Sequence, residues 1–173
     1  MHHDYRSDPV LAGALAYWRA KRGDRAMPSR RDIDPIEVRS LLPHLQLIEI
    51  VANRFRYRLI GTALVEAMGR DYTGRYPDDL FEGPRAKMIT DVYEAVRARQ
   101  EPMFLRSRYM TTKDVDLVAN RLYLPLAEDG RDVNMILGAL TFHFGSLELQ
   151  PGLWGSARLA GDAELEPVSV GND

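Results

Sequence analysis

The stretch that decides the fold is Gly61 to Phe81, GTALVEAMGRDYTGRYPDDLF. Leu64 and Met68 lie one helical turn apart in it, and Gly69 is typical of the residue that ends a helix. Asp71 to Gly74 then has the composition of a turn, and a second short element closes the stretch. A small helix between glycine-marked turns therefore interrupts what otherwise has the pattern of an antiparallel sheet.

The residues on the N-terminal side of this stretch predict a β-hairpin. Arg54 to Leu59 alternates charged and bulky residues with a period of two, which is typical of a strand with one buried face. Phe55, Tyr57 and Leu59 are expected on that face. Leu45 to Val51 predicts the preceding strand, and Ala52-Asn53 between the two predicts a tight turn.

On the C-terminal side the pattern predicts one long helix and three strands. Pro84 to Gln100 has Met88, Val92 and Val96 at helical spacing. The strands are expected over Met103 to Thr111, Val115 to Ala127 and Val133 to Phe144, the last two joined by a hairpin turn at Asp129-Gly130. We therefore predict an α+β fold, a five-stranded antiparallel sheet with helices packed on one face.

An N-terminal helix precedes the sheet. Asp8 and Pro9 predict its cap and first turn, and Gly23 its end. Leu11, Leu15 and Trp18 form an apolar stripe that covers either the domain's own sheet or a second copy of the chain. A short helix is also expected over residues 36–42. The predicted organisation is an N-terminal helical extension at residues 1–44, a core at 45–148 and a flexible C-terminal tail at 149–173, rich in Pro, Gly and acidic residues.

Composition excludes several classes of site. The chain has no cysteine, which rules out disulfides, thiolate zinc sites, iron–sulfur clusters and thiol nucleophiles. Its four histidines show no metal-ligand spacing, and His143 in an apolar strand is either a structural residue or a ligand contact. The net charge of −2 and the lack of a long apolar run favour neither nucleic acid nor a membrane as partner. We expect a cytoplasmic protein.

Short motifs carry a more particular resemblance. They are Tyr17-Trp18, Pro28-Ser29-Arg30, Asp32-Ile33-Asp34-Pro35, Phe55 to Thr62 and Gly69 to Gly74. In this order and spacing the chain resembles a bacterial family of PAS-like domains over about residues 10–147. The resemblance implies a stand-alone PAS-type sensory or protein-interaction module, a homodimer formed through the N-terminal helix and the sheet face, and an unidentified protein partner.

The resemblance also bears on cofactors. Photoactive flavin domains and cinnamoyl photoreceptors of the PAS class use a cysteine that this chain lacks, and haem-binding PAS sensors use a histidine that the long helix lacks. No haem, covalent flavin or metal is therefore expected, whereas a non-covalently bound flavin stays open. What remains is a small molecule in a cavity between the sheet and the helices.

The candidate lining residues are apolar or aromatic residues on the predicted inward positions: Tyr57, Leu59, Leu64, Met68, Tyr72, Met88, Val92, Val96, Tyr109, Leu122, Leu124 and Leu137. Any one of these is more often packed core than cavity wall. The tyrosines are the more informative members, because a buried phenol needs a hydrogen-bond partner and a ligand could supply one.

Two other functions are compatible with the sequence, an enzyme and a binding site for an anion or nucleic acid. No catalytic motif is present, so a rival enzyme on an α+β barrel would need a pair such as Tyr72 with Asp71 or Tyr109 with Asp116. Arginines on strands, including Arg54, Arg56, Arg58, Arg106, Arg108 and Arg121, indicate either solvated faces with ion pairs or a site for an anion or nucleic acid. The loop from Arg30 to Asp34 favours a structural ion-pair clasp. The sequence thus predicts a non-enzymatic sensory or interaction module.

Overall fold

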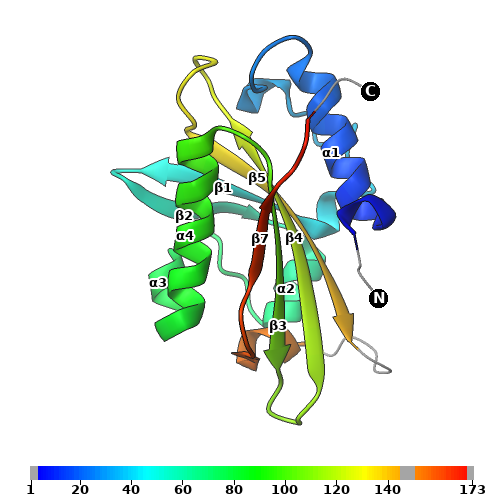
Figure 1. Ribbon diagram of the computed structural model, residues 1–173, viewed down its shortest axis with the longest axis vertical. Helices are drawn as coiled ribbons and strands as arrows, with labels where there is room; N and C mark the ends of the chain where they lie inside the picture. Colours follow the sequence, from blue (N-terminus) through cyan, green and yellow to red (C-terminus); the bar gives the residue numbers. More distant parts are fainter. Residues whose placement is uncertain (1–3, 145–150, 171–173) are drawn as a thin grey trace.

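The computed structural model describes residues 4–144 and 151–170. Their sheet is antiparallel and seven-stranded, in the order β2-β1-β5-β4-β3-β6, with β7 also paired to β3 (Figure 1). The strands are β1 Leu45–Val51, β2 Arg54–Ile60, β3 Met103–Met110, β4 Asp116–Leu126, β5 Met135–Phe144, β6 Arg158–Leu159 and β7 Glu164–Pro167. Five α-helices accompany the sheet in the described residues: α1 Pro9–Arg22, α2 Thr62–Met68, α3 Pro77–Leu80, α4 Gly83–Arg99 and α5 Leu153–Ser156. Three short 3-10 helices are η1 Tyr5–Ser7, η2 Arg30–Asp32 and η3 Leu42–His44. The predicted α+β class is confirmed.

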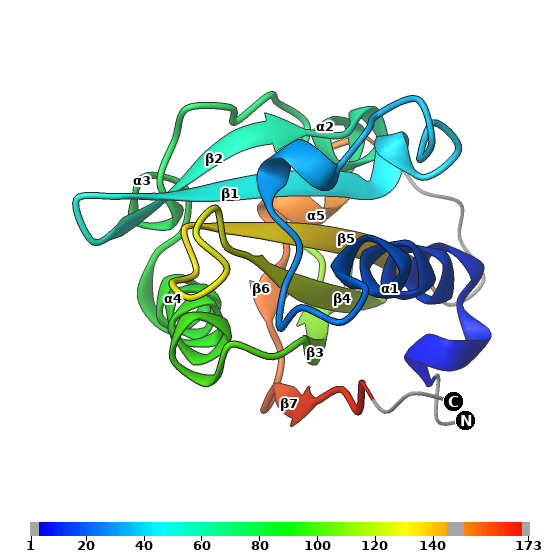
Figure 2. The same ribbon diagram turned by 90° about the horizontal axis from the view of Figure 1, so that it is seen from above.

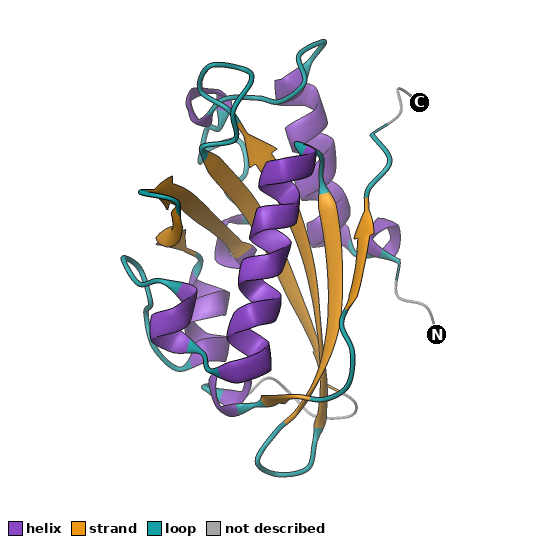
Figure 3. Ribbon diagram, turned by 60° about the vertical axis from the view of Figure 1, so that its left-hand side comes forward, coloured by secondary structure: helices purple, strands orange, loops and turns teal. Residues whose placement is uncertain are grey.

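The two long helices lie on opposite faces of the sheet. α4 packs on β3 and β4, and α1 packs on β4 and β5 (Figures 2 and 3). We call the face under α4 the inner face and the face under α1 the outer face. Almost every residue of β4 is buried, because this central strand is covered from both sides.

The helix α1 forms as its sequence predicts. Asp8 caps it, Pro9 occupies its first turn and Gly23 ends it. Its stripe of Leu11, Ala14, Leu15 and Trp18 is buried within the same chain. The apolar stripe therefore covers the domain's own sheet, which was one of the two alternatives left open.

A β-bulge in β2 overturns one inward assignment. Leu47 pairs with Leu59 and Ile48 with Tyr57, so Arg58 is left without a partner residue on β1. The extra residue reverses the alternation of side chains beyond Tyr57. Phe55 and Tyr57 are buried as expected, whereas Leu59 is 39% exposed.

The glycines of the deciding stretch act in two different ways. Gly69 ends α2 in a left-handed conformation with φ of 80°, as predicted. Gly61 instead has an ordinary extended backbone with φ of −67°. A Cβ there would lie 2.3 Å from the carbonyl oxygens of Leu42 and Pro43. Close approach of two backbone segments, rather than a special dihedral angle, requires glycine at this position.

The short helix expected over residues 36–42 does not form. The segment makes successive turns closed by i to i+3 hydrogen bonds, such as those from Glu37 N–H to Asp34 and from Leu41 N–H to Val38, and only η3 follows. One i to i+4 hydrogen bond, from Leu42 N–H to Val38 at 3.0 Å, forms in the segment, and Pro43 follows it directly.

The C-terminal tail expected to be flexible contains α5, β6 and β7 in its described part, residues 151–170. β7 pairs with Met103–Arg106 of β3, and the following Val168 is buried and donates its N–H to Pro102 at 2.9 Å. The open edge of β3 offers unpaired backbone groups that this segment satisfies. The sheet therefore has two strands more than predicted. The predicted boundary at 148/149 lies outside the described residues.

Candidate ligand site

Polar side chains gather beneath α4, which is unusual for the centre of a small domain. We call this group the inner-face cluster: Gln46, Tyr57, Tyr72, Tyr93, Ser107, Tyr109, Arg121 and Tyr123. It is contributed by β1, β2, the loop after α2, α4, β3 and β4. Each member is at most 3% exposed. The cluster therefore forms a buried polar layer between α4 and the sheet.

Long contacts link Gln46 and three of the tyrosines in this cluster. The Tyr93 hydroxyl donates to the Tyr57 hydroxyl at 3.3 Å, and the Gln46 amide donates to Tyr93 at 3.4 Å. Tyr72 donates to Gln46 Oε1 at 3.5 Å. Hydroxyl hydrogen bonds are usually about 2.7–2.8 Å long, so these contacts are weak. The ring of a fourth tyrosine, Tyr123, meets that of Tyr93 edge to face, with 5.1 Å between the ring centres.

Burial in this cluster shifts the tyrosine pKa values upward. Burial disfavours the phenolate, and it raises the pKa of Tyr123 to about 12. Burial likewise raises the pKa of Tyr57, Tyr72 and Tyr93. At neutral pH these four phenols are therefore neutral, and each can both donate and accept a hydrogen bond.

Tyr109 behaves differently because a cation is bound to it. Arg121, 1% exposed, donates to Ser107 Oγ at 2.7 Å and to the Tyr109 hydroxyl. Burial raises the pKa of Tyr109, but the charges of Arg121 and Arg85 outweigh that effect and lower it overall. Among the described residues no carboxylate forms an ion pair with Arg121. The buried guanidinium is thus held by two hydroxyl groups and by the rings of Tyr109 and Trp154, with no carboxylate beside it in the described part of the chain.

Arg85 lies in the first turn of α4 at the end of this cluster. It is 7% exposed, and its Nη1 donates to the carbonyl oxygens of Trp154 at 3.1 Å and Ala157 at 2.9 Å. Its guanidinium carbon lies 4.2 Å from the ring centre of Phe81 and 5.0 Å from that of Tyr109. Burial lowers the pKa of Arg85 to about 10. It is still charged at neutral pH.

The structure divides the residues predicted to line a cavity. Tyr57, Tyr72 and Tyr109 belong to the inner-face cluster. Val92 and Val96 are buried on α4, and Met88 is partly buried there. Leu64 and Met68 are buried on α2, which packs against α5 and η3.

Three of the predicted residues lie on the wrong face. Phe104 on β3 pairs with Leu122 and contacts Tyr5 beside α1, which places Leu122 on the outer face. Leu124 is two residues further along the same strand, and it pairs with Leu137. Leu122, Leu124 and Leu137 therefore pack under α1, and Leu59 is exposed by the bulge. The sequence did not identify Arg121 and Tyr123 as inner-face residues. Because β4 is buried on both faces, its sequence shows no polar–apolar alternation that would tell which residues face α4 and which face α1.

The pairs required by the rival enzyme do not form. Tyr72 is buried, whereas the Asp71 carboxylate is exposed and accepts hydrogen bonds from Thr73. Asp116 lies 3.4 Å from Arg108 on the surface, away from buried Tyr109. Within the described chain, no group of three or more His, Asp or Glu side chains could hold a metal.

Four of the other strand arginines form surface ion pairs. Carboxylates partner Arg54, Arg56, Arg106 and Arg108, whereas Arg58 at the bulge is exposed and Arg121 lies on the inner face. His143 is half-exposed, and its Nε2 lies 3.7 Å from Asp8 Oδ2 at the start of α1. These contacts are structural.

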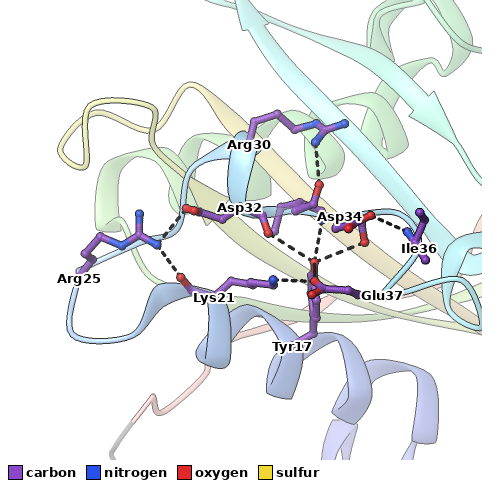
Figure 4. A network of polar contacts seen from close by, with 9 residues as sticks. Tyr17, Lys21, Arg25, Arg30, Asp32, Asp34, Ile36 and Glu37 are labelled. Carbon is purple, nitrogen blue, oxygen red and sulfur yellow. Dashed lines mark hydrogen bonds and ion pairs between the residues drawn. The ribbon is translucent and has the colours of Figure 1, made fainter.

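The loop after α1 is the ion-pair clasp that its sequence predicts (Figure 4). The Tyr17 hydroxyl donates to Glu37 at 2.9 Å and accepts from the Asp34 N–H at 2.8 Å. Lys21 pairs with the same Glu37 at 2.6 Å, and Arg25 pairs with Asp32 at 2.9 Å. The motif residues of this loop therefore hold α1 to the domain.

Comparison with known proteins agrees with the architecture. The sequence profile described as PAS domain matches residues 6–141. This chain belongs to the PAS domain family. The match confirms the resemblance carried by its motifs.

Solved structures of PAS-type domains are similar at low sequence identity. The Rhodobacter sphaeroides LOV protein is 14% identical, with a TM-score of 0.46 over 62% of this chain and 66% of that one. A fungal LOV domain photoreceptor is 16% identical, with a TM-score of 0.46 over 76% of this chain and 90% of that one. VqmA bound to DPO is 12% identical, with a TM-score of 0.46 over 62% and 56%. No curated protein matches this PAS domain. No helix among its described residues is long and apolar enough to cross a membrane.

Proposed function

We propose that this PAS domain is a non-enzymatic sensory module that binds a small polar molecule in the inner-face cluster. The observation that carries the proposal is the set of long contacts, 3.3–3.5 Å, among buried Gln46, Tyr57, Tyr72 and Tyr93. Buried polar groups stabilise a fold only when they are well hydrogen-bonded. A guest with its own donors and acceptors would replace weak contacts by shorter ones, which provides binding energy.

The position of the cluster supports a signalling role. It joins Tyr93 on α4 to Gln46 on β1. Arg121 and Tyr123 lie on β4, the strand that α4 covers on the inner face and α1 covers on the outer face. A ligand that pulls these groups together would favour one packing of α4 over another. The central strand would pass the difference to α1 on the outer face.

The output is proposed to be a contact with a second copy or a partner protein. Large apolar side chains remain exposed, Ile36 at 81% and Leu59 at 39%. Light scattering coupled to size exclusion tests self-association: a homodimer is expected, and the Ile36→Asp and Leu59→Asp variants should shift it towards monomer. A monomer at all concentrations would leave a different protein as the only recipient of the signal.

Ligand binding is tested on the full chain. Native mass spectrometry should show a species heavier than the polypeptide, and denaturation should release the small molecule. Tyr93→Phe removes a hydroxyl that contacts both Tyr57 and Gln46, so the thermal shift produced by the released compound should fall. Tyr76→Phe, outside the cluster, serves as control and should keep the full shift. A protein that carries nothing and that no metabolite stabilises would refute the sensor.

A further inference from the structure

A second site lies at the N-terminal end of α4. A cavity of about 630 Å³ is lined by residues 80–85, from the end of α3 into α4, and by Gly155 and residues 157–159 of the C-terminal segment. None of the inner-face cluster and none of the sequence-predicted lining residues contributes to its wall. Four of the ten lining residues lie beyond residue 141, outside the part of the chain that the PAS family profile matches. The cavity is therefore a feature that the C-terminal segment adds.

The wall contains an arginine with free donors. Arg85 uses Nη1 to bind the carbonyl groups of Trp154 and Ala157, whereas its Nε and Nη2 have no hydrogen-bond partner among the described residues. Both atoms are buried from solvent and the whole residue is only 7% exposed, so water does not replace the missing partners. Nε and Nη2 form the edge of a guanidinium that binds a carboxylate or phosphate with two parallel hydrogen bonds.

The surroundings of Arg85 carry an excess of positive charge, which also favours an anion. Arg85 and Arg121 both lie against the ring of Tyr109, at 5.0 and 5.4 Å from its centre. Neither forms an ion pair with a carboxylate within the part of the chain that the structure describes. Two buried cations without an acidic partner attract an anion.

The helix end contributes to the same potential. α4 has 17 residues, and no side chain caps its N-terminus. The positive end of the helix dipole therefore lies at the cavity wall, which includes Gly83, Pro84 and Arg85, although Pro84 has no N–H to offer. Arg158 also lines the cavity, and Glu82 supplies the one acidic side chain of this lining.

We propose that this cavity binds a small organic acid, with its carboxylate or phosphate group on Nε and Nη2 of Arg85. The apolar part of the ligand packs against Leu80, Phe81 and Leu159, which are in the same wall. The volume exceeds what an inorganic ion needs, since a single water occupies about 30 Å³ of liquid. The site stands apart from the proposed sensory function, because the inner-face cluster does not line it.

The two tryptophans offer a built-in readout. Trp154 contacts Arg85, and its Nε1 has no hydrogen-bond partner among the described residues. Trp18 Nε1 instead donates to Pro125 at 2.8 Å on the other side of β4. Nitrogen–proton NMR spectra of the full chain are recorded while benzoate, phenyl phosphate, inorganic phosphate or neutral benzyl alcohol is added at constant ionic strength. Benzoate and phenyl phosphate should shift the Trp154 indole signal and the Gly83 and Arg85 amides, with the Trp18 indole unchanged.

Variants assign the binding to particular groups. Arg85→Lys keeps the charge but loses the two-pronged edge, and it should weaken binding about tenfold. Arg158→Ala should weaken it about threefold, whereas Glu82→Gln should strengthen it, because the like charge is removed. Arg97→Ala at the far end of α4 is the matched control and should change nothing.

The outcomes separate this site from the inner-face cluster. Tyr93→Phe should leave benzoate binding intact, so failure of the sensory proposal would not affect this result. No shift of Trp154 or of the first-turn amides by either aromatic acid would refute the anion site. Equal binding of benzyl alcohol would refute the role of Arg85, and equal binding of inorganic and phenyl phosphate would refute the apolar part of the ligand.

Discussion

Asp8 at the start of α1 is hydrogen-bonded to Thr141 on β5, which joins the N-terminal helix to the sheet. Asp8 Oδ1 accepts the N–H groups of Val10 and Leu11 at 3.0 and 3.2 Å, and Oδ2 accepts the Thr141 hydroxyl at 2.6 Å. One carboxylate therefore both caps the helix and fixes it on the outer face. It also explains why the apolar stripe of α1 is used within its own chain.

Replacing Asp8 by Ala should lower the free energy of unfolding by about 2–3 kcal/mol. The cap contributes about 1 kcal/mol, and the Thr141 hydroxyl would lose its partner as well. Urea unfolding measures the change. Asp4→Ala is the control, since Asp4 caps only the three-residue η1 on the surface, and it should cost less than about 0.5 kcal/mol. Equal costs for the two variants would contradict the proposed joint role of Asp8.

Gly61 is required because a side chain would collide with a neighbouring backbone segment, not because its φ is unusual. Two alanine variants distinguish these two causes. Gly61→Ala would place a Cβ 2.3 Å from two backbone oxygens, which cannot move aside as a side chain could. We expect a loss of about 3 kcal/mol or more in unfolding free energy. Gly74 has φ of 83° and open space around it, so Gly74→Ala should cost only about 1 kcal/mol. Chemical denaturation of both variants gives the comparison, and the reverse ranking would refute the packing argument.

The order of helices and strands could be predicted because each element carries its own local signal. β2, the turn at Ala52 and Asn53, and α1 follow directly from period, turn residues and capping, respectively. The two faces of β4 could not be assigned in this way. Arg121 and Leu122 are both fully buried, so alternation disappears where helices cover both sides of a strand.

Non-local pairing limited the remaining predictions. The bulge at Arg58 depends on how β2 aligns with β1, and it moves Leu59 to the surface. β7 forms because β3 offers an open edge, although the sequence of the segment is typical of a flexible tail. The candidate site was predicted in part through Tyr57, Tyr72 and Tyr109. The sequence does not indicate that Arg85 is buried, because a charged residue in the first turn of a helix is usually solvated.

The two tryptophans should respond differently to replacement by phenylalanine. Trp18→Phe removes the donor to Pro125 and leaves a buried carbonyl unpaired, in addition to the smaller ring. Trp154→Phe removes an Nε1 that has no partner among the described residues. We expect Trp18→Phe to cost about 1–2 kcal/mol more than Trp154→Phe in thermal or urea unfolding. Equal losses would show that the Trp18 hydrogen bond contributes little.

Alkaline pH should destabilise the domain through the inner-face cluster. Tyr57, Tyr72, Tyr93 and Tyr123 have pKa values above the ordinary 10.0, with Tyr123 at about 12, because burial disfavours their phenolates. In the unfolded chain they ionise near 10.0, so above that pH the unfolded state binds fewer protons than the native state. Their contribution to stability is therefore complete below pH 10 and is lost as pH rises from about 10 through 12.

Urea unfolding at several pH values, with absorbance at 295 nm as the measure of phenolate, tests this dependence. The native protein should show fewer phenolates at pH 11 than its unfolded form, and stability should fall steeply from pH 10 upward. Tyr57→Phe should make that fall shallower, because one buried ionisable group is removed. Tyr76→Phe, outside the cluster, should leave the slope as in the wild type. A stability that is flat between pH 10 and 12 would mean that water reaches these phenols in the native state.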